Sequence, residues 1–353
     1  MVDFAGLGLF SNLGLFAVAA VVVWFAGTRL AEYAHQISKV TGLGQAIVGI
    51  VVLAGVTSLP EIAVTATASL AGDSVLAVNN IFGSIAMQVA LLAIVDAVVG
   101  RDALTSVVPD PIVMLEGNLN MILITFAAMA MTVGDIAFLG AGLWSWSCLA
   151  GYLGCVWILS RSDGHRSWLA AYDGKVDSRL IRQQMEREDS AADPASNLML
   201  AVKTAGVAAA ILVAGFVLAR TGGAIAEKSG LGQSLVGFVL VALATSLPEL
   251  SAAIGAARQR LYAMAISDIL GTNLINVGLV FLADILDSGE PIFNRVDRFA
   301  AAGALLCVML TGVFMAGLSE RRDKAWMRMG YDSIIVAVLY VAGIALLYTM
   351  RPV

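Results

Sequence analysis

The chain contains two copies of one segment, and this duplication limits its possible folds more than any other feature. Residues 42–61 read GLGQAIVGIVVLAGVTSLPE and residues 230–249 read GLGQSLVGFVLVALATSLPE, with 13 of the 20 positions identical. The match continues at the same offset of 188 residues, where NNIFGSIAMQ (79–88) overlies SDILGTNLIN (267–276). The sequence therefore predicts two related halves with a shared origin.

Composition places both halves in a membrane. The 353 residues are 59% hydrophobic and 13% charged, so they carry too few charges to cover a soluble protein of this length. Apolar runs of roughly 20 residues, enough to cross a hydrocarbon core, recur along the whole chain. Ten spans are predicted, at about 8–31, 42–69, 76–99, 110–132, 136–159, 198–220, 230–256, 262–286, 296–318 and 331–350.

The span order makes the duplication an inverted repeat. The first copy starts in span two and the second in span seven, so the two copies enter the membrane from opposite sides. We predict an all-α polytopic membrane protein with two inverted five-helix repeats. Its parts are a first repeat at 1–160 with its motif at 42–88, a connector at 161–197, and a second repeat at 198–353 with its motif at 230–276. Such repeats place a substrate site between them near the midplane and permit alternating access.

The basic residues predict an orientation. Sixteen of the 21 Lys and Arg residues fall on one side of the predicted spans and five on the other. Because cytoplasmic loops carry the excess of positive charge, the 161–197 loop is expected in the cytoplasm and both termini outside an inner cell membrane. The net charge of −5 offers no concentrated basic surface for nucleic acid. The expected partners are the lipid bilayer and small cations, and the sequence points to no protein partner.

Each TSLPE motif places a carboxylate inside an apolar segment. Glu61 and Glu249 cost at least a few kcal/mol there unless they are paired or bind a cation. The preceding prolines lack a backbone donor, so both helices are expected to kink and to free nearby carbonyl groups. Those carbonyls lie at about Ala54–Thr57 and Ala242–Thr245.

Other oxygen and amide groups accompany each glutamate. Two hydroxyl residues precede each glutamate within a turn, and the next span contributes two polar side chains spaced i, i+4 on one face. In chain order these are Thr57, Ser58, Ser84 and Gln88 in the first copy, and Thr245, Ser246, Thr272 and Asn276 in the second. Oxygen ligands of this kind suit Na⁺ and Ca²⁺. Two glutamates can balance one Ca²⁺, several Na⁺ or two protons. Counting charges therefore does not identify the ion that is exchanged for Ca²⁺.

The blocks AGVTSLPE…GSIAMQ and ALATSLPE…GTNLIN resemble the alpha-1 and alpha-2 repeats of the calcium:cation antiporter superfamily, nearest its sodium/calcium exchanger branch. The resemblance covers effectively the whole chain. It implies that Glu61 and Glu249 bind Ca²⁺ and Na⁺ in turn, and that spans one and six move past a fixed core. It also implies an oxygen cage completed by the hydroxyls of Thr57, Ser58, Ser84, Thr245, Ser246 and Thr272, with the carbonyls of Ala54 and Ala242 as Na⁺ ligands.

The chain departs from the family pattern in ways that bear on its substrate. Where members usually carry Gly-Asn before the Gly-Ser pair, the second repeat has Ser-Asp, so Asp268 adds a third acid. Asp268 lies i−4 from Thr272 and is included in the candidate metal site. Asn276 stands where some prokaryotic exchangers have Asp, and Gln88 is one methylene longer than the usual Asn.

Several other residues are expected to be structural. Glu116, Asp96 and Asp284 are predicted at helix ends or interfaces rather than as ligands. The three cysteines, Cys148, Cys155 and Cys307, lie inside spans without metal-type spacing and are expected to pack.

We therefore predict a secondary antiporter, without a cofactor, that extrudes Ca²⁺ in exchange for Na⁺. Exchange of Ca²⁺ or another cation for H⁺ on the same site is the close alternative. An intramembrane enzyme is a different class and is disfavoured, because catalysis by buried acids needs a water-accessible pocket and no His accompanies these acids. A membrane scaffold would leave the paired glutamates without a purpose. The sequence has no GxxxxGK[ST] motif for ATP, which favours transport driven by an ion gradient.

Overall fold

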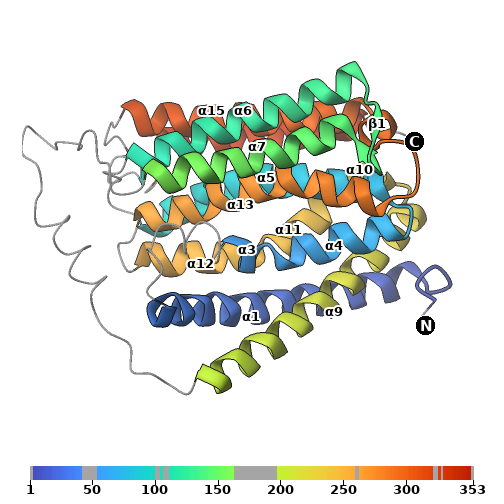
Figure 1. Ribbon diagram of the computed structural model, residues 1–353, viewed down its shortest axis with the longest axis horizontal. Coiled ribbons are helices and arrows are strands. Elements are labelled where there is room, and N and C mark those ends of the chain that lie inside the picture. Colours follow the sequence, from blue (N-terminus) through green and yellow to red (C-terminus); the bar gives the residue numbers. More distant parts are fainter. Residues whose placement is uncertain are drawn as a thin grey trace, which may run out of the picture.

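The computed structural model describes residues 3–41, 54–99, 104–105, 111–162, 197–258, 262–320, 325–326 and 329–350. Its long helices lie side by side along one direction, and the two chain ends lie at the same end of the bundle (Figure 1). An even number of crossings produces this arrangement, as the ten predicted spans require.

The two halves contain corresponding elements. The first consists of α1 (Leu9–Thr41), α3 (Ala54–Thr57), α4 (Leu59–Leu70), α5 (Ser74–Val99), α6 (Pro111–Val133), the hairpin β1 (Ala137–Phe138) and β2 (Ala141–Gly142), and α7 (Leu143–Ser162). The second consists of α9 (Asn197–Ser229), α10 (Gly232–Leu235), the π-helical η2 (Val236–Val241), α11 (Ala242–Thr245), α12 (Leu247–Arg258), α13 (Tyr262–Leu286), α14 (Ile292–Arg295), α15 (Arg298–Glu320), the hairpin β3 (Ala325–Trp326) and β4 (Met329–Gly330), and α16 (Tyr331–Met350).

The number of spans fits the prediction. Among the described residues, eight helices are long and apolar enough to cross a membrane, and a bent pair in the second half makes nine. The remaining predicted span, 42–69, begins in a stretch outside the described residues and ends in the shorter apolar helix α4.

Some predicted boundaries are wrong, for identifiable reasons. The predicted span 8–31 agrees with the apolar stretch Leu9–Arg29, although helix α1 itself continues beyond that stretch to Thr41. Helix α9 likewise continues to Ser229. Helix α7 begins at Leu143 rather than 136 because a two-residue hairpin precedes it. The turn residues Leu139 and Gly140 have φ angles of 48° and 85°, the left-handed values that a tight hairpin turn requires.

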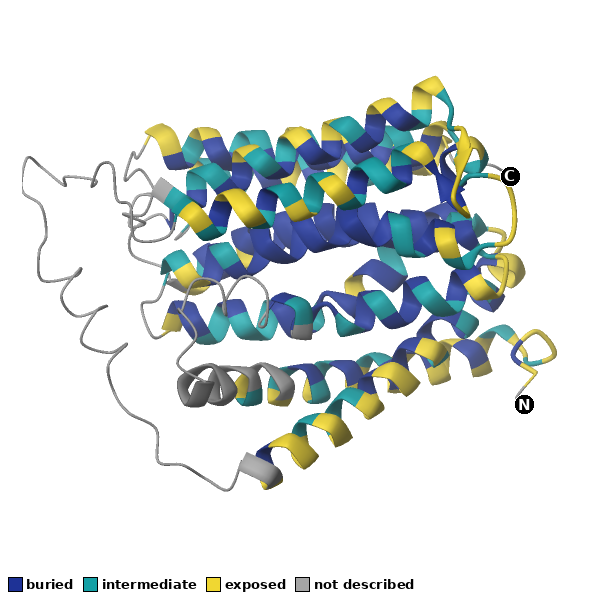
Figure 2. Cartoon of the chain, in the orientation of Figure 1, coloured by how far each residue is buried: buried dark blue, intermediate teal, exposed yellow. Residues whose placement is uncertain are grey.

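The helices form layers around two central spans. Helices α5 and α13 are almost completely buried in the middle of the molecule (Figure 2). Helices α1 and α9 pack on each other and form a separate layer on one side, where they contact α4, α12 and the short segments of the broken spans (Figure 1). Helices α6, α7, α15 and α16 cover the other side of the core.

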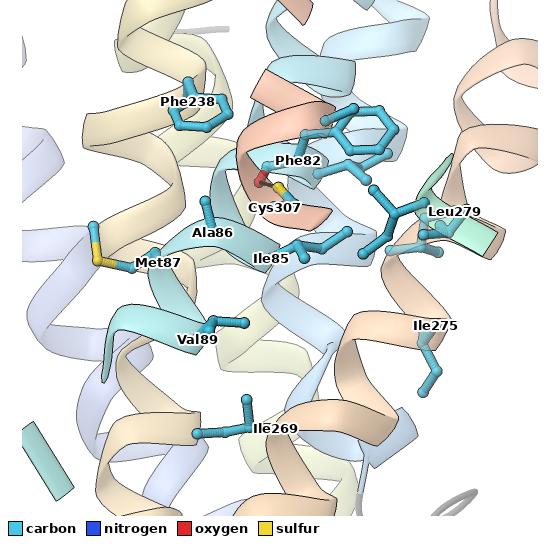
Figure 3. Packing of buried hydrophobic residues seen from close by; sticks show 14 of the residues in the cluster. Phe82, Ile85, Ala86, Met87, Val89, Phe238, Ile269, Ile275, Leu279 and Cys307 are labelled. Atoms are coloured by element: carbon cyan, nitrogen blue, oxygen red, sulfur yellow. Dashed lines mark hydrogen bonds between the residues drawn. The ribbon is translucent and has the colours of Figure 1, made fainter. Parts of the chain in front are cut away.

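The centre of the core brings the two repeats into backbone contact. A Cβ atom on Gly83 of α5 would meet the backbone of Phe238 in η2, so these two segments touch directly at this glycine. Nearby, the Cys307 thiol donates to the Phe82 carbonyl at 3.0 Å (Figure 3). All three cysteines are free and buried, which agrees with their predicted packing role.

Asp96 and Asp284 are anchors at helix ends, as predicted. Asp284 accepts hydrogen bonds from the backbone N–H groups of Ile292 at 2.8 Å and Gly142 at 2.6 Å. Asp96 accepts the corresponding pair, from Leu104 at 2.6 Å and Gly330 at 2.7 Å. Each carboxylate thus fixes one hairpin and one following segment to the end of a central helix.

We expect Asp284→Ala to lower the free energy of unfolding by about 3 kcal/mol, because two buried N–H groups lose a charged acceptor. Asp284→Asn retains one acceptor oxygen and should lose about half as much. Unfolding of the purified protein in detergent measures both effects. Glu227→Gln, which changes an exposed carboxylate on α9, is the control and should leave stability unchanged. Equal stability of Asp284→Ala and the parent protein would contradict the anchoring role.

Candidate cation-binding site

Both TSLPE motifs break their helices at the serine. Ser58 and Ser246 have ψ angles of 2° and 5°, outside helical geometry, and separate α3 from α4 and α11 from α12. The two arms of the second break are bent by 43°. The predicted kinks are therefore confirmed. Proline is favoured in the first turn of a new helix, where its missing N–H would have no partner, so each motif ends one helix and starts another.

Glu61 and Glu249 follow the breaks in the first turns of α4 and α12. Both side chains have no exposed surface, and their carboxylate oxygens have no hydrogen-bond partner among the described residues. The helix N-terminus favours a negative charge at each position, but it replaces only part of the lost hydration. A pair of buried acids in this condition needs cations or protons as counter-charge.

Hydroxyl groups from both repeats lie next to the glutamates. Ser84 and Thr245 lie against Glu61 without completing a hydrogen bond to it, and Thr57 lies against Glu249 in the same way. Hydroxyl and carboxylate oxygens are hard ligands of the kind that Na⁺ and Ca²⁺ prefer.

The hydroxyls also join the repeats in two equivalent pairs. Ser84 Oγ lies 3.1 Å from Thr245 Oγ1, and Thr57 Oγ1 lies 3.5 Å from Thr272 Oγ1. The two contacts are equivalent, because the 188-residue offset relates Ser84 to Thr272 and Thr57 to Thr245. The sequence predicted each of these residues, and the fold brings them together across the interface between the repeats.

The expected free carbonyls are occupied in this structure. Ala54 O accepts from Ser58 N at 2.9 Å and from Ser58 Oγ at 2.6 Å, and it also accepts from Thr57 Oγ1 at 3.2 Å. Ala242 O accepts from Ser246 N at 3.0 Å and from Thr245 Oγ1 at 3.3 Å. The expectation that these two carbonyls are free is wrong here, because Ser and Thr hydroxyls bond back to carbonyls three or four residues earlier.

The amide side chains of the two repeats differ. Gln88 Nε2 donates to Ser246 Oγ at 3.5 Å across the interface. Asn276, its counterpart, is fully buried, and neither its Oδ1 nor its Nδ2 has a partner among the described residues. The additional methylene of Gln88 explains why only that side chain reaches across.

Asp268 is also buried, with 6% of its surface exposed and neither carboxylate oxygen hydrogen-bonded within the described part of the chain. When ionised, Asp268 and Glu61 would each disfavour a negative charge on Glu249. No three Asp, Glu, His or Cys side chains among the described residues are grouped closely enough to hold one metal ion. Asp268 therefore lies near Glu249 but does not converge with both glutamates on a single point.

Two polar residues near the site were not identified from the sequence. Asn80 Oδ1 accepts from Thr245 Oγ1 at 3.5 Å, and Asn120 of α6 donates to Leu270 O at 2.8 Å. Asn80 precedes Ser84 by four residues, a spacing that indicates a shared helix face. Glu116 is fully buried where α6 packs in the bundle, so its predicted interface position is confirmed.

Known proteins resemble the chain over nearly its full length. The family described as sodium/calcium exchanger protein matches residues 11–161 and 200–349. The inner membrane protein YrbG of Escherichia coli (strain K12) is 25% identical over 341 residues, which cover 96% of this chain and 97% of that protein. The putative antiporter CaxA of Alkalimonas amylolytica is 25% identical over 83% of this chain and 88% of its own length.

The fold is similar to a solved structure. The sodium-calcium exchanger NCX_Mj, in a crystal soaked with Na⁺ and Sr²⁺, superimposes with a TM-score of 0.62 and is 18% identical. The match covers 96% of this chain and 99% of that one. Two five-helix repeats of inverted topology are therefore the architecture of this chain.

Proposed function

The chain belongs to the sodium/calcium exchanger family of membrane cation antiporters, and from this premise we propose that it exchanges Ca²⁺ for Na⁺ at the site between Glu61 and Glu249. One observation carries the proposal. Two fully buried carboxylates occupy equivalent positions in the two repeats, and neither has a hydrogen-bond partner among the described residues. The family is one of exchangers, so the enzyme and scaffold alternatives have no support.

The charge and the donor atoms favour these ions. Two carboxylates balance one Ca²⁺, and the surrounding hydroxyls supply further hard oxygens with flexible geometry. Two or three Na⁺ ions bring a similar total charge to the same oxygens. Competition for one set of ligands is what couples the movement of the two ions in opposite directions.

We assign the ligands as follows. The glutamates bind Ca²⁺ and Na⁺ in turn, and the hydroxyls and amides around them complete the shell: Thr57, Ser58, Ser84, Gln88, Thr245, Ser246, Thr272 and Asn276. The carbonyls of Ala54 and Ala242 join the shell for Na⁺ when the hydroxyls that now occupy them rotate away. Asp268 is a further acid beside Glu249.

Alternating access is assigned to the layer formed by α1 and α9. Each helix crosses a motif helix at a glycine: a Cβ on Gly27 would meet the Pro248 ring, and one on Gly215 would meet the Ala63 side chain. Because a glycine has no side chain to interlock with its neighbour, these contacts favour a layer that slides over the site. Pro248 directly precedes Glu249, and Ala63 follows Glu61 by two residues. With the 161–197 loop in the cytoplasm, both termini lie on the opposite, non-cytoplasmic side of the cell membrane.

Uptake of ⁴⁵Ca²⁺ into proteoliposomes tests the proposal. Vesicles are loaded with Na⁺, with K⁺, or with an acidic buffer that creates a proton gradient. Uptake that requires internal Na⁺ is the expected result. Uptake driven by protons alone would support the Ca²⁺/H⁺ alternative, in which two protons neutralise the glutamates. Absence of Ca²⁺ flux under every gradient would contradict the proposal.

A further inference from the structure

Buried hydroxyl groups continue from Glu61 along one face of α4. Thr65 and Ser69 follow Glu61 at four-residue spacing, which places the three side chains on one side of the helix. Thr65 is 0% exposed and Ser69 is 2% exposed, and neither hydroxyl oxygen has a hydrogen-bond partner among the described residues. A buried hydroxyl without a partner is unfavourable, so water or a passing ion is the partner that these two groups lack.

The line of hydroxyls leads to a pocket at the end of the bundle that carries both chain termini (Figure 1). This cavity of about 440 Å³ lies between the N-terminal residues, the turn after α4, and helices α9 and α10. Its charged lining consists of three carboxylates and one guanidinium, from Asp3, Asp73, Glu227 and Arg220. The excess of acids attracts cations, and Asp73 follows Ser69 by four residues. The acidic pocket therefore begins where the hydroxyls end.

The second repeat lacks these hydroxyls. Under the 188-residue offset, Thr65 corresponds to Ala253 and Ser69 to Ala257. Both alanines are buried in the hydrophobic core. Because the repeats are inverted, α4 and α12 run from the breaks at the site toward opposite ends of the bundle (Figure 1). The buried hydroxyls thus connect the site with the end that carries the termini, and α12 has no equivalent groups at these positions.

We propose that Thr65 and Ser69 form an entry route by which cations pass between the acidic pocket and Glu61. Each hydroxyl oxygen replaces a water of the ion's hydration shell, in steps of about 6 Å along the helix. The inference rests on the proposed function, since it takes Ca²⁺ as an ion that enters. It makes the two faces of the transporter unequal: the hydroxyls serve ions that enter at the end with the termini, and not ions that enter at the other end.

Vesicles of one orientation are needed to test a one-sided route. The full chain is reconstituted at no more than one protein per vesicle, and a tag after Val353 captures the vesicles whose C-terminus faces outward. Vesicles that carry protein but are not captured have the opposite orientation.

Accessibility of introduced cysteines tests the route without a transport measurement. A membrane-impermeant, positively charged methanethiosulfonate is added to captured vesicles that contain Thr65→Cys or Ser69→Cys. Both cysteines should react, Ser69→Cys faster because it lies closer to the pocket. Ala253→Cys and Ala257→Cys are the matched controls, and they should react no faster than the parent protein, whose three cysteines are buried.

Thr65→Val keeps the shape of the side chain and removes its hydroxyl. Initial ⁴⁵Ca²⁺ uptake at low external Ca²⁺ depends on entry, so it should fall in captured vesicles by about tenfold, the equivalent of one polar contact. Uptake by vesicles of the opposite orientation should be unchanged, as should the maximal rate in both. The Tm should stay equal or rise, because a buried hydroxyl without a partner is lost.

Two further variants accompany this measurement. Ser69→Ala should show the same one-sided loss, and it replaces Thr65→Val if that protein does not fold. Thr67→Val is the matched control, since Thr67 lies two residues from Thr65 and therefore on another face of α4.

Cysteines at positions 65 and 69 that react no faster than those at 253 and 257 would contradict the route. An equal fall in uptake for both orientations would place the hydroxyls in the ion site itself, and a lower Tm with unchanged uptake would make them structural. Either result would overturn the inference. Absence of uptake by the parent protein would instead contradict the proposed function, and with it a role of the hydroxyls in Ca²⁺ entry, even if both cysteines reacted.

Discussion

Glu249→Gln is expected to reduce Na⁺-dependent ⁴⁵Ca²⁺ uptake at least about a hundredfold. Removal of one partner from a buried charge pair costs about 3–5 kcal/mol, and each 1.4 kcal/mol corresponds to a factor of ten in binding. The glutamine preserves size and retains one oxygen, but it removes half of the charge that balances Ca²⁺. Glu61→Gln should have a similar effect, because the two residues occupy equivalent positions in the repeats.

The stability of the same variants separates a binding role from a structural one. Without bound ions, Glu249 is a buried carboxylate with no hydrogen-bond partner among the described residues. Its neutralisation should therefore keep or raise the ion-free Tm while it removes the Ca²⁺-dependent increase. Glu227→Gln should behave like the parent protein in both assays. Uptake by Glu249→Gln above one tenth of the parent rate would show that the carboxylate does not bind the transported ion.

The sequence predicted the parts of the site that depend on the repeat. An acid in an apolar span needs a counter-charge wherever it lies, so Glu61 and Glu249 could be proposed as candidate ion ligands from the sequence alone. The breaks at Ser58 and Ser246 followed from the prolines, since a missing N–H acts locally. The contact between Thr57 and Thr272 could not be derived from the sequence, because it depends on how two distant spans cross.

Other features depend on packing that a pattern does not encode. Hydropathy marks only the apolar part of a helix, so the extension of α1 to Thr41 was missed. The occupied carbonyl of Ala54 reflects the rotamers chosen by Ser58 and Thr57, and several choices are compatible with the same sequence. Asn120 was missed because its acceptor, the Leu270 carbonyl, lies on a helix 150 positions along the chain.

Gly83→Ala should impair both stability and ion binding through one added methyl group. A Cβ at this position would overlap the backbone of Phe238, and backbone atoms cannot turn away as a flexible side chain can. Overpacking of this kind costs about 1–3 kcal/mol. It also pushes α5 away from η2 and displaces Ser84, the next residue, from its 3.1 Å contact with Thr245.

We therefore expect Gly83→Ala to lower both the Tm and the apparent Ca²⁺ affinity. A loss of about 1.4 kcal/mol of binding free energy would lower the affinity about tenfold. Unfolding in detergent and ⁴⁵Ca²⁺ uptake measure the two effects on one preparation. Gly154→Ala is the matched control, because a Cβ on that glycine of α7 has no neighbour within 4 Å. Loss of stability with unchanged Ca²⁺ affinity would mean that the α5–η2 contact supports the fold alone. Loss of both, with Gly154→Ala unaffected, would show that the close approach of the repeats holds the hydroxyl ligands in place.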